Sequence, residues 1–458
     1  MRSVKIKKSA HPLTDGLKTD LYEMTMAAGY FENRHNPEAV FELYCHTLPA
    51  DRSYLVACGL AQAIEYILNL RFDDRDIDYL KNLSIFDKVS PAFFHYLKKF
   101  KFSGDLWAMP EGTICFAHEP ILQVKAPIIQ AQILETYLLS VINIQTLVAT
   151  KAARVVTAAC GEGNNRPVVD FGSRRAHGPE AGVLAARAAF IGGCLGTSNV
   201  YAGRAFGIPV FGTMAHSWVA SFKSEKASFE RFRHVFPKHT ILLVDTYDTI
   251  KGVDAAIRLK GDIRGVRLDS GNIDKLSRKT RRLLDQNGLP HVKILASGNL
   301  NEYKIDALVR AGAPVDMFGV GTEMVTSRDH PALDLTYKLV QTRDDRGRPR
   351  YHYKTSQGKA TRPGRKQVFR SFDGDGLMRG DMIGLFDEKV PKNSRRLLEP
   401  FIEKGKLIRS LPAADAIRQK AAQGLSQLPS SLRAIGTKGR YPVSTGRGIS
   451  ALKRRPGR

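Results

Sequence analysis

The stretch between residues 241 and 321 decides the fold of this 458-residue chain, because short apolar runs recur there at a regular spacing. Each run ends in small or charged residues: ILLVD (241–245), GVRLD (265–269), ILASG (294–298) and MFGVG (317–321). Helical patterns at 274–286 and 302–311 fill two of the gaps. Continuous apolar strands that alternate with helices indicate a parallel sheet buried on both faces.

The same rhythm begins further upstream, with VVDFG (168–172), a helical pattern at 181–195 and PVFG (209–212). Six such units in sequence favour a βα barrel, although an open doubly wound sheet fits the pattern too. We therefore predict an α/β fold whose catalytic domain is a βα barrel over residues 141–334.

The preceding residues predict a separate α+β layer within 1–140. A helix is expected to open at Thr19-Asp20, where Asp20 and Glu23 have the spacing of a capping box. Strands are expected at 40–44, 106–109 and 121–124. From the local sequence pattern alone, we expect Tyr22 to be an aromatic residue of the core or of an interface.

Composition narrows the class of protein. Hydrophobic residues make up 43% of the chain and charged residues 25%, as in a globular protein. The five cysteines include no CxxC pair, which argues against a thiol-bound zinc and for a reducing cytoplasm. The N-terminus lacks the apolar segment of a secretory signal, and the apolar stretch 126–150 is interrupted by glutamines and asparagine, so we expect no membrane span.

The formal net charge of +25 suggests a nucleic-acid binder until the charge is mapped. Nearly all of the excess lies in three segments: +4 in 1–10, +8 in 343–370 and +12 in 404–458. We predict that 343–370 is an exposed hairpin or loop and that 406–458 is a basic, flexible tail. These segments fit a linker, a contact for an acidic surface or solubilising charge, and the body of the protein is electrically ordinary.

In a βα barrel the working groups follow the C-terminal ends of the strands. The residues found there combine cations, glycines and hydroxyls with a few carboxylates, which suits a phosphorylated substrate and a divalent metal. They are Asp170, Arg174, Arg175, His177, His216, Ser217, Asp245, Arg267, Asp269, Ser270, Ser297, Gly298, Gly319, Gly321 and Thr322.

Each of these motifs also has an ordinary structural interpretation. Arg174 and Arg175 could pair with acidic residues instead of holding a carboxylate or phosphate. His216 could be structural instead of serving as a nucleophile or proton carrier. The segment 267–272 could be a plain strand-to-helix turn with Ser270 or Asn272 as its N-cap. The turns at 296–299 and 319–322 could cradle a phosphate, but each pattern alone is common.

Taken together, the segments resemble the nicotinate phosphoribosyltransferase family from about Asp15 to Tyr337. No single motif carries the resemblance; their order and spacing do. The motifs are TDLYEMTM (19–26), AMPEG (108–112), EP (119–120), DFGSRRAHGP (170–179), GTSNVYAG (196–203), GTMAHSW (212–218), LLVDTYDT (242–249), VRLDSGN (266–272), ASGNL (296–300) and FGVGT (318–322).

This resemblance implies a type II phosphoribosyltransferase-like fold, an irregular barrel whose N-terminal α+β domain is completed by about 335–405. It implies a homodimer with shared active sites, and no membrane or nucleic-acid partner. The implied reaction joins nicotinate to 5-phosphoribosyl 1-pyrophosphate, giving nicotinate mononucleotide and pyrophosphate with Mg²⁺, coupled to ATP hydrolysis through a phosphohistidine.

The resemblance also assigns roles to residues. His216 is similar to the histidine that ATP phosphorylates. Arg267 and Asp269 are expected at the ribose-phosphate region, and these two residues and His216 are the expected catalytic residues. Phe171 and Tyr22 of the partner subunit would sandwich the pyridine ring, and Arg174 or Arg175 would hold the nicotinate carboxylate or a nearby phosphate. The remaining expected substrate-binding residues are Thr213, Ser217, Ser270, Ser297, Gly298, Gly319, Gly321 and Thr322.

The chemistry is compatible with this inventory. Displacement of pyrophosphate from ribose C1 needs positioning and stabilisation of the leaving group, and the pyridine nitrogen needs no strong base. Nicotinamide is the alternative acceptor; the Arg174-Arg175 pair and the GTMAHSW form favour the acid. A nucleic-acid-associated protein is the alternative of a different class.

Overall fold

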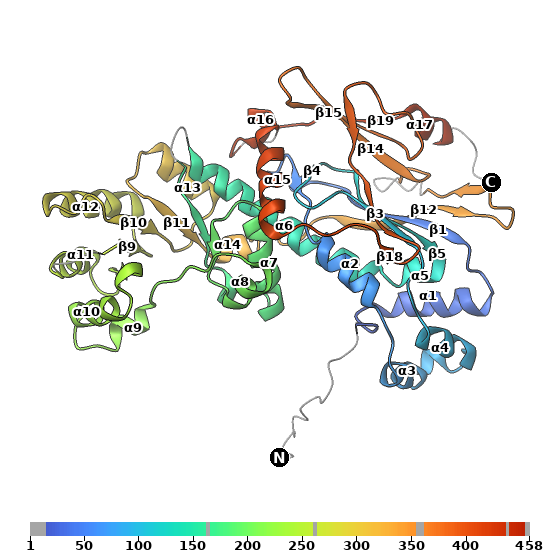
Figure 1. Ribbon diagram of the computed structural model, residues 1–458, viewed down its shortest axis with the longest axis horizontal. Helices are drawn as coiled ribbons and strands as arrows, with labels where there is room; N and C mark the ends of the chain where they lie inside the picture. The colour runs from blue at the N-terminus through green and yellow to red at the C-terminus, as the bar shows by residue number, and fades with distance from the viewer. Residues whose placement is uncertain (1–14, 162–164, 260–262, 354–360, 437–438, 454–458) are drawn as a thin grey trace, which may run out of the picture.

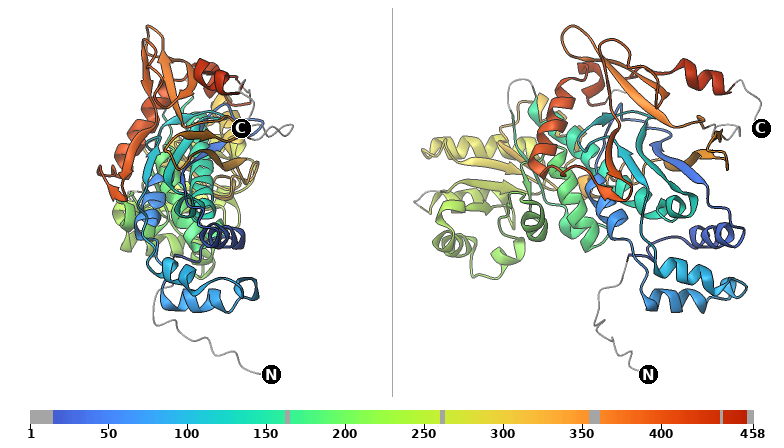
Figure 2. Two further views of the ribbon diagram at one scale, coloured as in Figure 1. Left: turned by 90° about the vertical axis from the view of Figure 1, so that its right-hand side faces the viewer. Right: turned by 45° about the vertical axis from the view of Figure 1, so that its right-hand side comes forward.

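The computed structural model describes residues 15–161, 165–259, 263–353, 361–436 and 439–453. The molecule is elongated, with a parallel sheet at one end and, at the other, a large antiparallel sheet and a smaller mixed one (Figure 1). Helices α6 (Glu135–Cys160) and α7 (Pro179–Ile191) pack side by side between the two ends. Turned by 90°, the molecule is much narrower (Figure 2). The basic residues at 1–10, 454 and 455 lie outside the described part of the chain.

The parallel sheet confirms the predicted α/β class. Its strand order is β7-β6-β11-β10-β9-β8, and an isolated bridge between Thr197 and Val210 extends it beyond β7. No pairing among the described residues joins Val210 to β8, so the barrel is irregular and open at that point. The strands are β6 (Val168–Asp170), β7 (Gly196–Thr197), β8 (Ile241–Leu243), β9 (Gly265–Leu268), β10 (Lys293–Ala296) and β11 (Met317–Val320).

Polar caps start the helices that follow these strands. Asp248, Asn272 and Asn301 each accept a hydrogen bond from a backbone N–H in the first turn of the next helix. The helices of this half, besides α7, are α8 (Val200–Phe206), α9 (His216–Ala220), α10 (Glu225–Val235), α11 (Thr249–Ile257), α12 (Ile273–Gln286), α13 (Glu302–Arg310) and α14 (Thr322–Val325), with short 3-10 turns at Ser173–Arg175 and Pro237–His239.

Helix α6 is the core helix of the molecule. By length and composition, residues 128–160 are apolar enough to cross a membrane, but 61% of the most apolar window is buried inside the protein. The helix contacts α7, α13, α2 (Leu60–Asn69) and strand β2 (Leu55–Val56). Its apolar surface is therefore used for internal packing.

The larger antiparallel sheet mixes N-terminal strands with later ones, in the order β13-β12-β1-β5-β3-β17-β18. Strand β1 (Glu38–Cys45) pairs with β5 (Pro120–Pro127) on one side and with β12 (Leu335–Arg343) on the other. The chain after the parallel sheet therefore returns to complete this sheet. The other strands are β3 (Asp105–Ala108), β13 (Pro349–Tyr351), β17 (Glu399–Glu403) and β18 (Lys406–Leu407).

The remaining N-terminal elements pack around this sheet, and helix α6 crosses the predicted boundary at residue 140. These elements are α1 (Leu21–Glu32), α3 (Asp74–Lys81), a 3-10 turn at Ser84–Phe86, α4 (Pro91–Lys98), α5 (Ile128–Gln132) and β4 (Ile114–Cys115), which pairs with β2. The predicted division of the chain at residues 140 and 334 stays a prediction.

The predicted flexible tail is wrong for the described residues up to 453. This segment forms α15 (Ala414–Ser426), α16 (Ser430–Arg433), β19 (Val443–Thr445) and α17 (Arg447–Lys453). Strand β19 pairs in the parallel direction with β15 (Met378–Leu385) in a second, mixed sheet, whose other strands, β14 (Lys366–Phe372) and β16 (Ser394–Arg396), are antiparallel to their neighbours. A few apolar side chains, Ile417, Ala421, Leu428 and Leu432 among them, are buried and suffice to dock the segment despite its charge.

The basic segment 343–370 is only partly the exposed hairpin that we predicted. Its first part is the β12–β13 hairpin with exposed arginines, and residues 354–360 lie outside the described chain. From residue 366 onward it is core strand β14, in which two of its cations are buried and paired. Lys366 Nζ lies 2.7 Å from Glu42, and Arg370 Nη2 lies 2.6 Å from Asp381.

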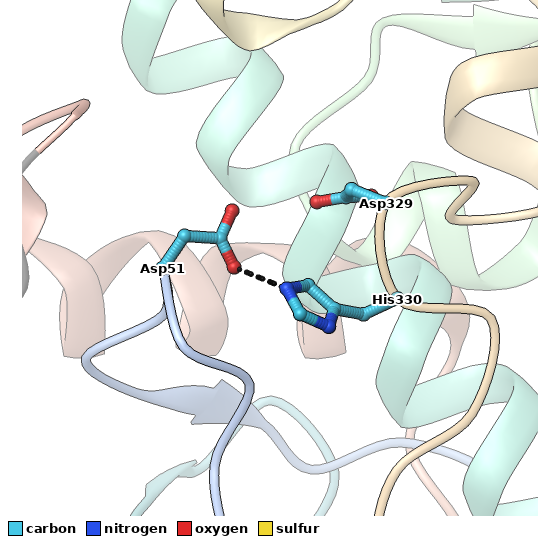
Figure 3. A group of neighbouring side chains, drawn as sticks. All are labelled: Asp51, Asp329 and His330. Carbon is cyan, nitrogen blue, oxygen red and sulfur yellow. Dashed lines mark ion pairs between the residues drawn. The ribbon is translucent and has the colours of Figure 1, made fainter.

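A network of charged side chains ties α6 to both ends of the molecule. Lys151 is fully buried, and its Nζ lies 2.7 Å from Glu302 of α13 and 2.8 Å from Asp329, which follows α14. Figure 3 shows Asp329 near Asp51, which belongs to the N-terminal half. The carboxylate of Asp51 forms an ion pair of 3.0 Å with His330. The carboxylates of Asp51, Glu302 and Asp329 are matched by Lys151 and by the buried guanidinium groups of Arg52 and Arg154.

This balance makes the group in Figure 3 an ionic link and not a metal centre. Asp51, Asp329 and His330 have the spacing of a metal site, but their oxygens already face cations or accept hydrogen bonds. Burial raises the pKa of Asp329, but the hydrogen bond from Lys151 and the charge of Arg52 outweigh it and hold the pKa well below its usual value. The network therefore stabilises the fold above about pH 4, and this stabilisation is lost as the pH falls.

Lys151→Met tests the network. Removing the cation leaves two carboxylates facing each other in the interior, and we expect a loss of about 3–5 kcal/mol in the free energy of unfolding. Lys18→Met, which breaks an exposed pair with Asp15, is the control and is expected to cost under about 1 kcal/mol. Urea denaturation at pH 7 measures both; equal losses would contradict this account.

Candidate active site

The ends of the parallel strands enclose a cavity of about 530 Å³ at their C-terminal edge. Twelve of the fifteen site residues predicted from the sequence line it, and they come from the last residues of β9 and β11, from the turns after β6, β9, β10 and β11, and from the segment 213–216 at the start of α9. These residues are Phe171, Arg174, Arg175, Thr213, His216, Arg267, Asp269, Ser297, Gly298, Gly319, Gly321 and Thr322.

Asp245 organises the turn after β9 from its place after β8. One of its oxygens, Oδ2, accepts hydrogen bonds from the backbone N–H of Asp269 (2.9 Å) and from the Ser270 hydroxyl (2.7 Å). Asp269 Oδ1 then accepts a short hydrogen bond from the hydroxyl of Ser297, which follows β10. Side-chain hydrogen bonds therefore connect three successive strand ends.

Two glycines allow the turns to close around the cavity. Gly298 has φ +87°, and a Cβ there would lie 1.7 Å from the carbonyl oxygen of Asp269. A Cβ on Gly319 would lie 2.5 Å from the ring of Phe171, so this ring packs directly on the glycine. Both positions need glycine because another chain segment occupies the place of the side chain.

The turns present unused backbone donors to the cavity. Among the described residues, nothing accepts a hydrogen bond from the N–H groups of Gly298, Gly321 or Thr322. Gly321 is also the N-cap of α14, where the first N–H groups of a helix are free. Such converging amides bind the oxygens of a phosphate group.

His216 is held at the entrance to α9 by groups from two other turns. Its Nδ1 lies 3.2 Å from the hydroxyl of Thr246, and its Nε2 lies 3.8 Å from Asp269 Oδ2. The side chain is 46% exposed and lines the cavity. The imidazole is therefore oriented through one nitrogen and accessible through the other, as a nucleophile or proton carrier requires.

The charge of the cavity is positive. Arg267 is mostly buried, and its Nη1 donates to the Thr213 hydroxyl. Burial lowers the pKa of Arg267, and the negative charges of Asp269 and Asp245 raise it, but by less. Arg174 and Arg175 are exposed, line the cavity and form no ion pair among the described residues, so their guanidinium groups face no acidic neighbour there. Three arginines against the single lining carboxylate of Asp269 suit an anionic ligand.

The other three predicted site residues, Ser217, Ser270 and Tyr22, lie elsewhere. Ser217 is inside α9, and Ser270 faces Asp245 and not the cavity. The N-cap of α12 is Asn272, one of the two candidates for that position. Tyr22 is 45% exposed on α1 and lines a second cavity, of about 510 Å³, together with His177.

The expected capping box before Tyr22 is wrong. The Asp20 side chain accepts no hydrogen bond from the first turn of α1. Glu23 is buried and accepts hydrogen bonds from the backbone N–H and the hydroxyl of Thr136 near the start of α6. The pair Asp20 and Glu23 therefore fixes α1 against α6 and leaves Tyr22 facing outward.

Several residues of the site have no role assigned by the resemblance. Asp245 is among the strand-end residues named from the sequence, because it ends the ILLVD run just as Asp269 ends GVRLD. Thr246 had no comparable signal, since its contact with His216 joins residues 30 positions apart. Ser198, Met214, Asn299 and Leu300 also line the cavity.

These features define an α/β enzyme with a cavity for a phosphorylated substrate at the carboxyl edge of its parallel sheet. Residues 17–143 match the nicotinate phosphoribosyltransferase (NAPRTase) N-terminal domain, and residues 167–344 match the NAPRTase family. The chain therefore belongs to the nicotinate phosphoribosyltransferase family, and it is a phosphoribosyltransferase.

Individual proteins agree with this assignment. The chain is 48% identical to nicotinate phosphoribosyltransferase pncB2 of Mycobacterium tuberculosis, over 93% of this chain and 91% of that protein. It is 39% identical to nicotinate phosphoribosyltransferase of Bacillus subtilis, over 93% and 92%. The crystal structure of human nicotinic acid phosphoribosyltransferase matches with a TM-score of 0.81 and 27% identity, over 95% of this chain and 99% of that one, which confirms the predicted fold class.

Gly298→Ala tests the packing of the turn after β10. We expect it to destabilise the protein by more than the roughly 1 kcal/mol that a left-handed alanine costs, because the methyl group also displaces Asp269. Gly288→Ala is the matched control, since Gly288 has φ +71° with nothing near its Cβ. Thermal unfolding and enzyme activity are measured for both. Equal losses of stability together with equal activities would contradict the packing.

Proposed function

We propose that this protein joins nicotinate to 5-phosphoribosyl 1-pyrophosphate, giving nicotinate mononucleotide and pyrophosphate, in NAD biosynthesis. The observation that carries the proposal is the cavity, in which a ring platform, unpaired arginines and free backbone amides converge from successive strand ends. Membership of the family supports the same reaction.

Phe171 and the neighbouring arginines suit the pyridine carboxylate. The Phe171 ring packs on Gly319 and lines the cavity, so its other face offers an aromatic surface for stacking. Arg174 and Arg175 lie three and four residues further on and have free guanidinium groups. A guanidinium binds a carboxylate bidentately, which favours nicotinate over the neutral nicotinamide.

The turns after β10 and β11 suit the sugar phosphate. The free N–H groups of Gly298, Gly321 and Thr322 would bind the 5-phosphate, and Arg267 and Asp269 would contact the ribose-phosphate region. In the reaction the pyridine nitrogen forms a bond to ribose C1, and the bond between C1 and the pyrophosphate oxygen breaks. Holding both reactants in line supplies most of the acceleration.

Asp245 and Asp269 are the residues that would hold Mg²⁺. Asp245 Oδ1 is buried with no hydrogen-bond partner among the described residues, and Asp269 Oδ2 has only the distant His216 beside it. Carboxylate oxygens combined with substrate phosphates are the usual ligands of this ion. Bound there, Mg²⁺ would neutralise charge on the departing pyrophosphate.

His216 is the proposed phosphoryl acceptor from ATP. With Nδ1–H donating to the Thr246 hydroxyl, the lone pair on Nε2 is free to attack the γ-phosphorus as ADP leaves. Water later cleaves the phosphohistidine to phosphate and histidine. The Thr246 hydroxyl can accept this hydrogen bond, so its contact with Nδ1 is compatible with the tautomer that the attack needs.

Tyr22 supports a homodimer with shared active sites. It is exposed next to Leu21 (50%) and Met26 (38%) on α1, an apolar surface that a second copy of the chain would cover. Tyr22 of the partner subunit would then complete the ring sandwich with Phe171; a purified chain that sediments as a monomer would contradict this.

The five cysteines are all unpaired, which supports a cytoplasmic protein.

An acceptor assay tests the function. Purified protein with 5-phosphoribosyl 1-pyrophosphate should release pyrophosphate with nicotinate and not with nicotinamide, and faster with ATP than without.

Arg174→Gln and Arg175→Gln separate the roles of the two arginines. The variant that loses the carboxylate contact should lose about 10- to 100-fold in kcat/KM for nicotinate, as for a charge-assisted hydrogen bond. Arg282→Gln, on exposed α12, is the control. Use of nicotinamide alone would refute the acid specificity.

His216→Ala tests the coupling to ATP. We expect the variant to lose ATP hydrolysis while retaining slow, ATP-independent synthesis of the mononucleotide, because the binding groups for both reactants remain. ADP and mononucleotide are measured in the same reaction, and His239→Ala, an exposed histidine away from the cavity, is the control. Full coupling in the His216 variant would exclude it as the acceptor.

A further inference from the structure

Part of the excess positive charge lies around a small cavity far from the catalytic one in sequence. This β16–α15 cavity, of about 110 Å³, lies between strands β14 and β16, helix α15 and the segment 110–114. Helix α15 runs beside β4 in Figure 1, and the second, mixed sheet stands next to it. The cavity is lined by the cations Arg370, Arg395, Arg396 and Lys420 and, among the described lining residues, by one carboxylate, Glu399.

Two of these cations lack a partner. Arg395 and Lys420 form no hydrogen bond or ion pair with any described residue, although Arg395 lies 4.7 Å from the centre of the Phe372 ring. Burial is the main cause that lowers the pKa of both groups. At Arg395 the charge of Arg370 lowers the pKa further and Asp381 and Glu399 oppose it; at Lys420 Glu399 opposes the shift, while Arg395 and Arg409 add to it. These like charges are therefore held close together and partly out of water, which is unfavourable unless an anion joins them.

Arg370 adds a buried donor to the same cavity. It is fully buried and lies opposite Arg395 in the pairing of β14 with β16. Its Nε and Nη2 bind the carboxylate of Asp381, but its Nη1 has no partner among the described residues. A buried guanidinium nitrogen without an acceptor is rare, because leaving it unpaired costs the full desolvation of the group.

The neighbouring carboxylates do not neutralise these cations. Glu399 is engaged in a close ion pair with Arg409 at the edge of the cavity. Asp381 is already shared by Arg370 and the hydroxyl of Tyr441. The fully buried Glu119 also faces Arg370, 4.0 Å from its Nη2. These carboxylates pair with Arg370 and Arg409, and none of them forms an ion pair with Arg395 or Lys420 within the described chain.

We propose that the β16–α15 cavity binds a phosphate-sized oxyanion, held by Arg370 Nη1, Arg395 and Lys420. Guanidinium and ammonium groups are the usual partners of phosphate oxygens. The volume is well below the 300–1,000 Å³ of pockets for larger organic ligands, so the site suits one phosphate group and not a whole nucleotide. The ligand joins cations of β14, β16 and α15, and so fixes the basic C-terminal segment to the second sheet.

Thermal unfolding of the full chain tests this proposal, with inorganic phosphate compared with chloride at equal ionic strength. In chloride, the double variant Arg395→Gln, Lys420→Gln should melt at or above the wild-type temperature, because it removes the repulsion. In phosphate, wild type should be stabilised and the double variant should need at least 10-fold more phosphate for the same shift. The catalytic cavity is unchanged in both proteins, so its own phosphate binding cancels in the comparison.

The matched control is Lys392→Gln, Lys406→Gln, which removes two exposed lysines of the same region and should respond to phosphate like wild type. The same melting experiment with pyrophosphate and with adenosine monophosphate distinguishes the source of the phosphate group. Free phosphate alone should give the stabilisation, and adenosine monophosphate should give no further stabilisation that depends on Arg395 and Lys420. An unchanged phosphate response in the double variant would overturn the proposal.

Diffraction from crystals soaked in tungstate, an electron-dense tetrahedral dianion, gives an independent answer. We expect an anomalous peak within hydrogen-bond distance of Arg370 Nη1, Arg395 and Lys420, in addition to any peak in the catalytic cavity. A peak in the catalytic cavity alone would overturn the assignment.

Discussion

The carboxylate of Asp245 is the constraint on which the catalytic cavity depends. It binds the backbone N–H of Asp269 and the hydroxyl of Ser270, and Asp269 in turn accepts the hydroxyl of Ser297. Three strand ends therefore keep one relative arrangement, and Gly298 closes onto the carbonyl of Asp269. These hydrogen bonds continue the links between β8, β9 and β10 beyond the paired strands, into the turns that line the cavity.

The distribution of charge separates the chemistry of the molecule into two places. In the catalytic cavity, a few arginines and one histidine face free backbone amides. Most of the other excess charge lies in segments that composition alone assigns to an exposed hairpin or loop and to a flexible tail. The described part of these segments is largely folded: Lys366 and Arg370 are buried and paired, and Lys420 of α15 lines a second, smaller cavity together with Arg395 of β16.

The sequence predicted the parallel half of the molecule well because its signals are local. Apolar runs that end in Asp, Ser-Gly or Gly-x-Gly mark both the strand and the functional turn after it, so Asp269, Gly298 and Gly321 could be placed in one cavity. Pairings across long separations carry no such signal. The contact of Glu23 with Thr136 and that of His216 with Thr246 had to be seen in the structure.

The error about the C-terminal segment has a physical origin. Its composition is poor in aliphatic residues, and composition reports how much apolar surface a segment has and not where it lies. Ile417 and Ala421 fall on one face of α15 and are buried, while Gly112 and Gly424 let this helix approach the segment before β4 closely. A small but well-placed apolar face is enough to fold a strongly basic segment.

A crystal structure with both nicotinate and 5-phosphoribosyl 1-pyrophosphate bound tests the central claim most directly. The account predicts the 5-phosphate on the N–H groups of Gly298, Gly321 and Thr322, with the pyridine ring stacked on Phe171. Density for the ring and phosphate at any other place, such as the cavity beside Tyr22 and His177 of the same chain, would contradict it.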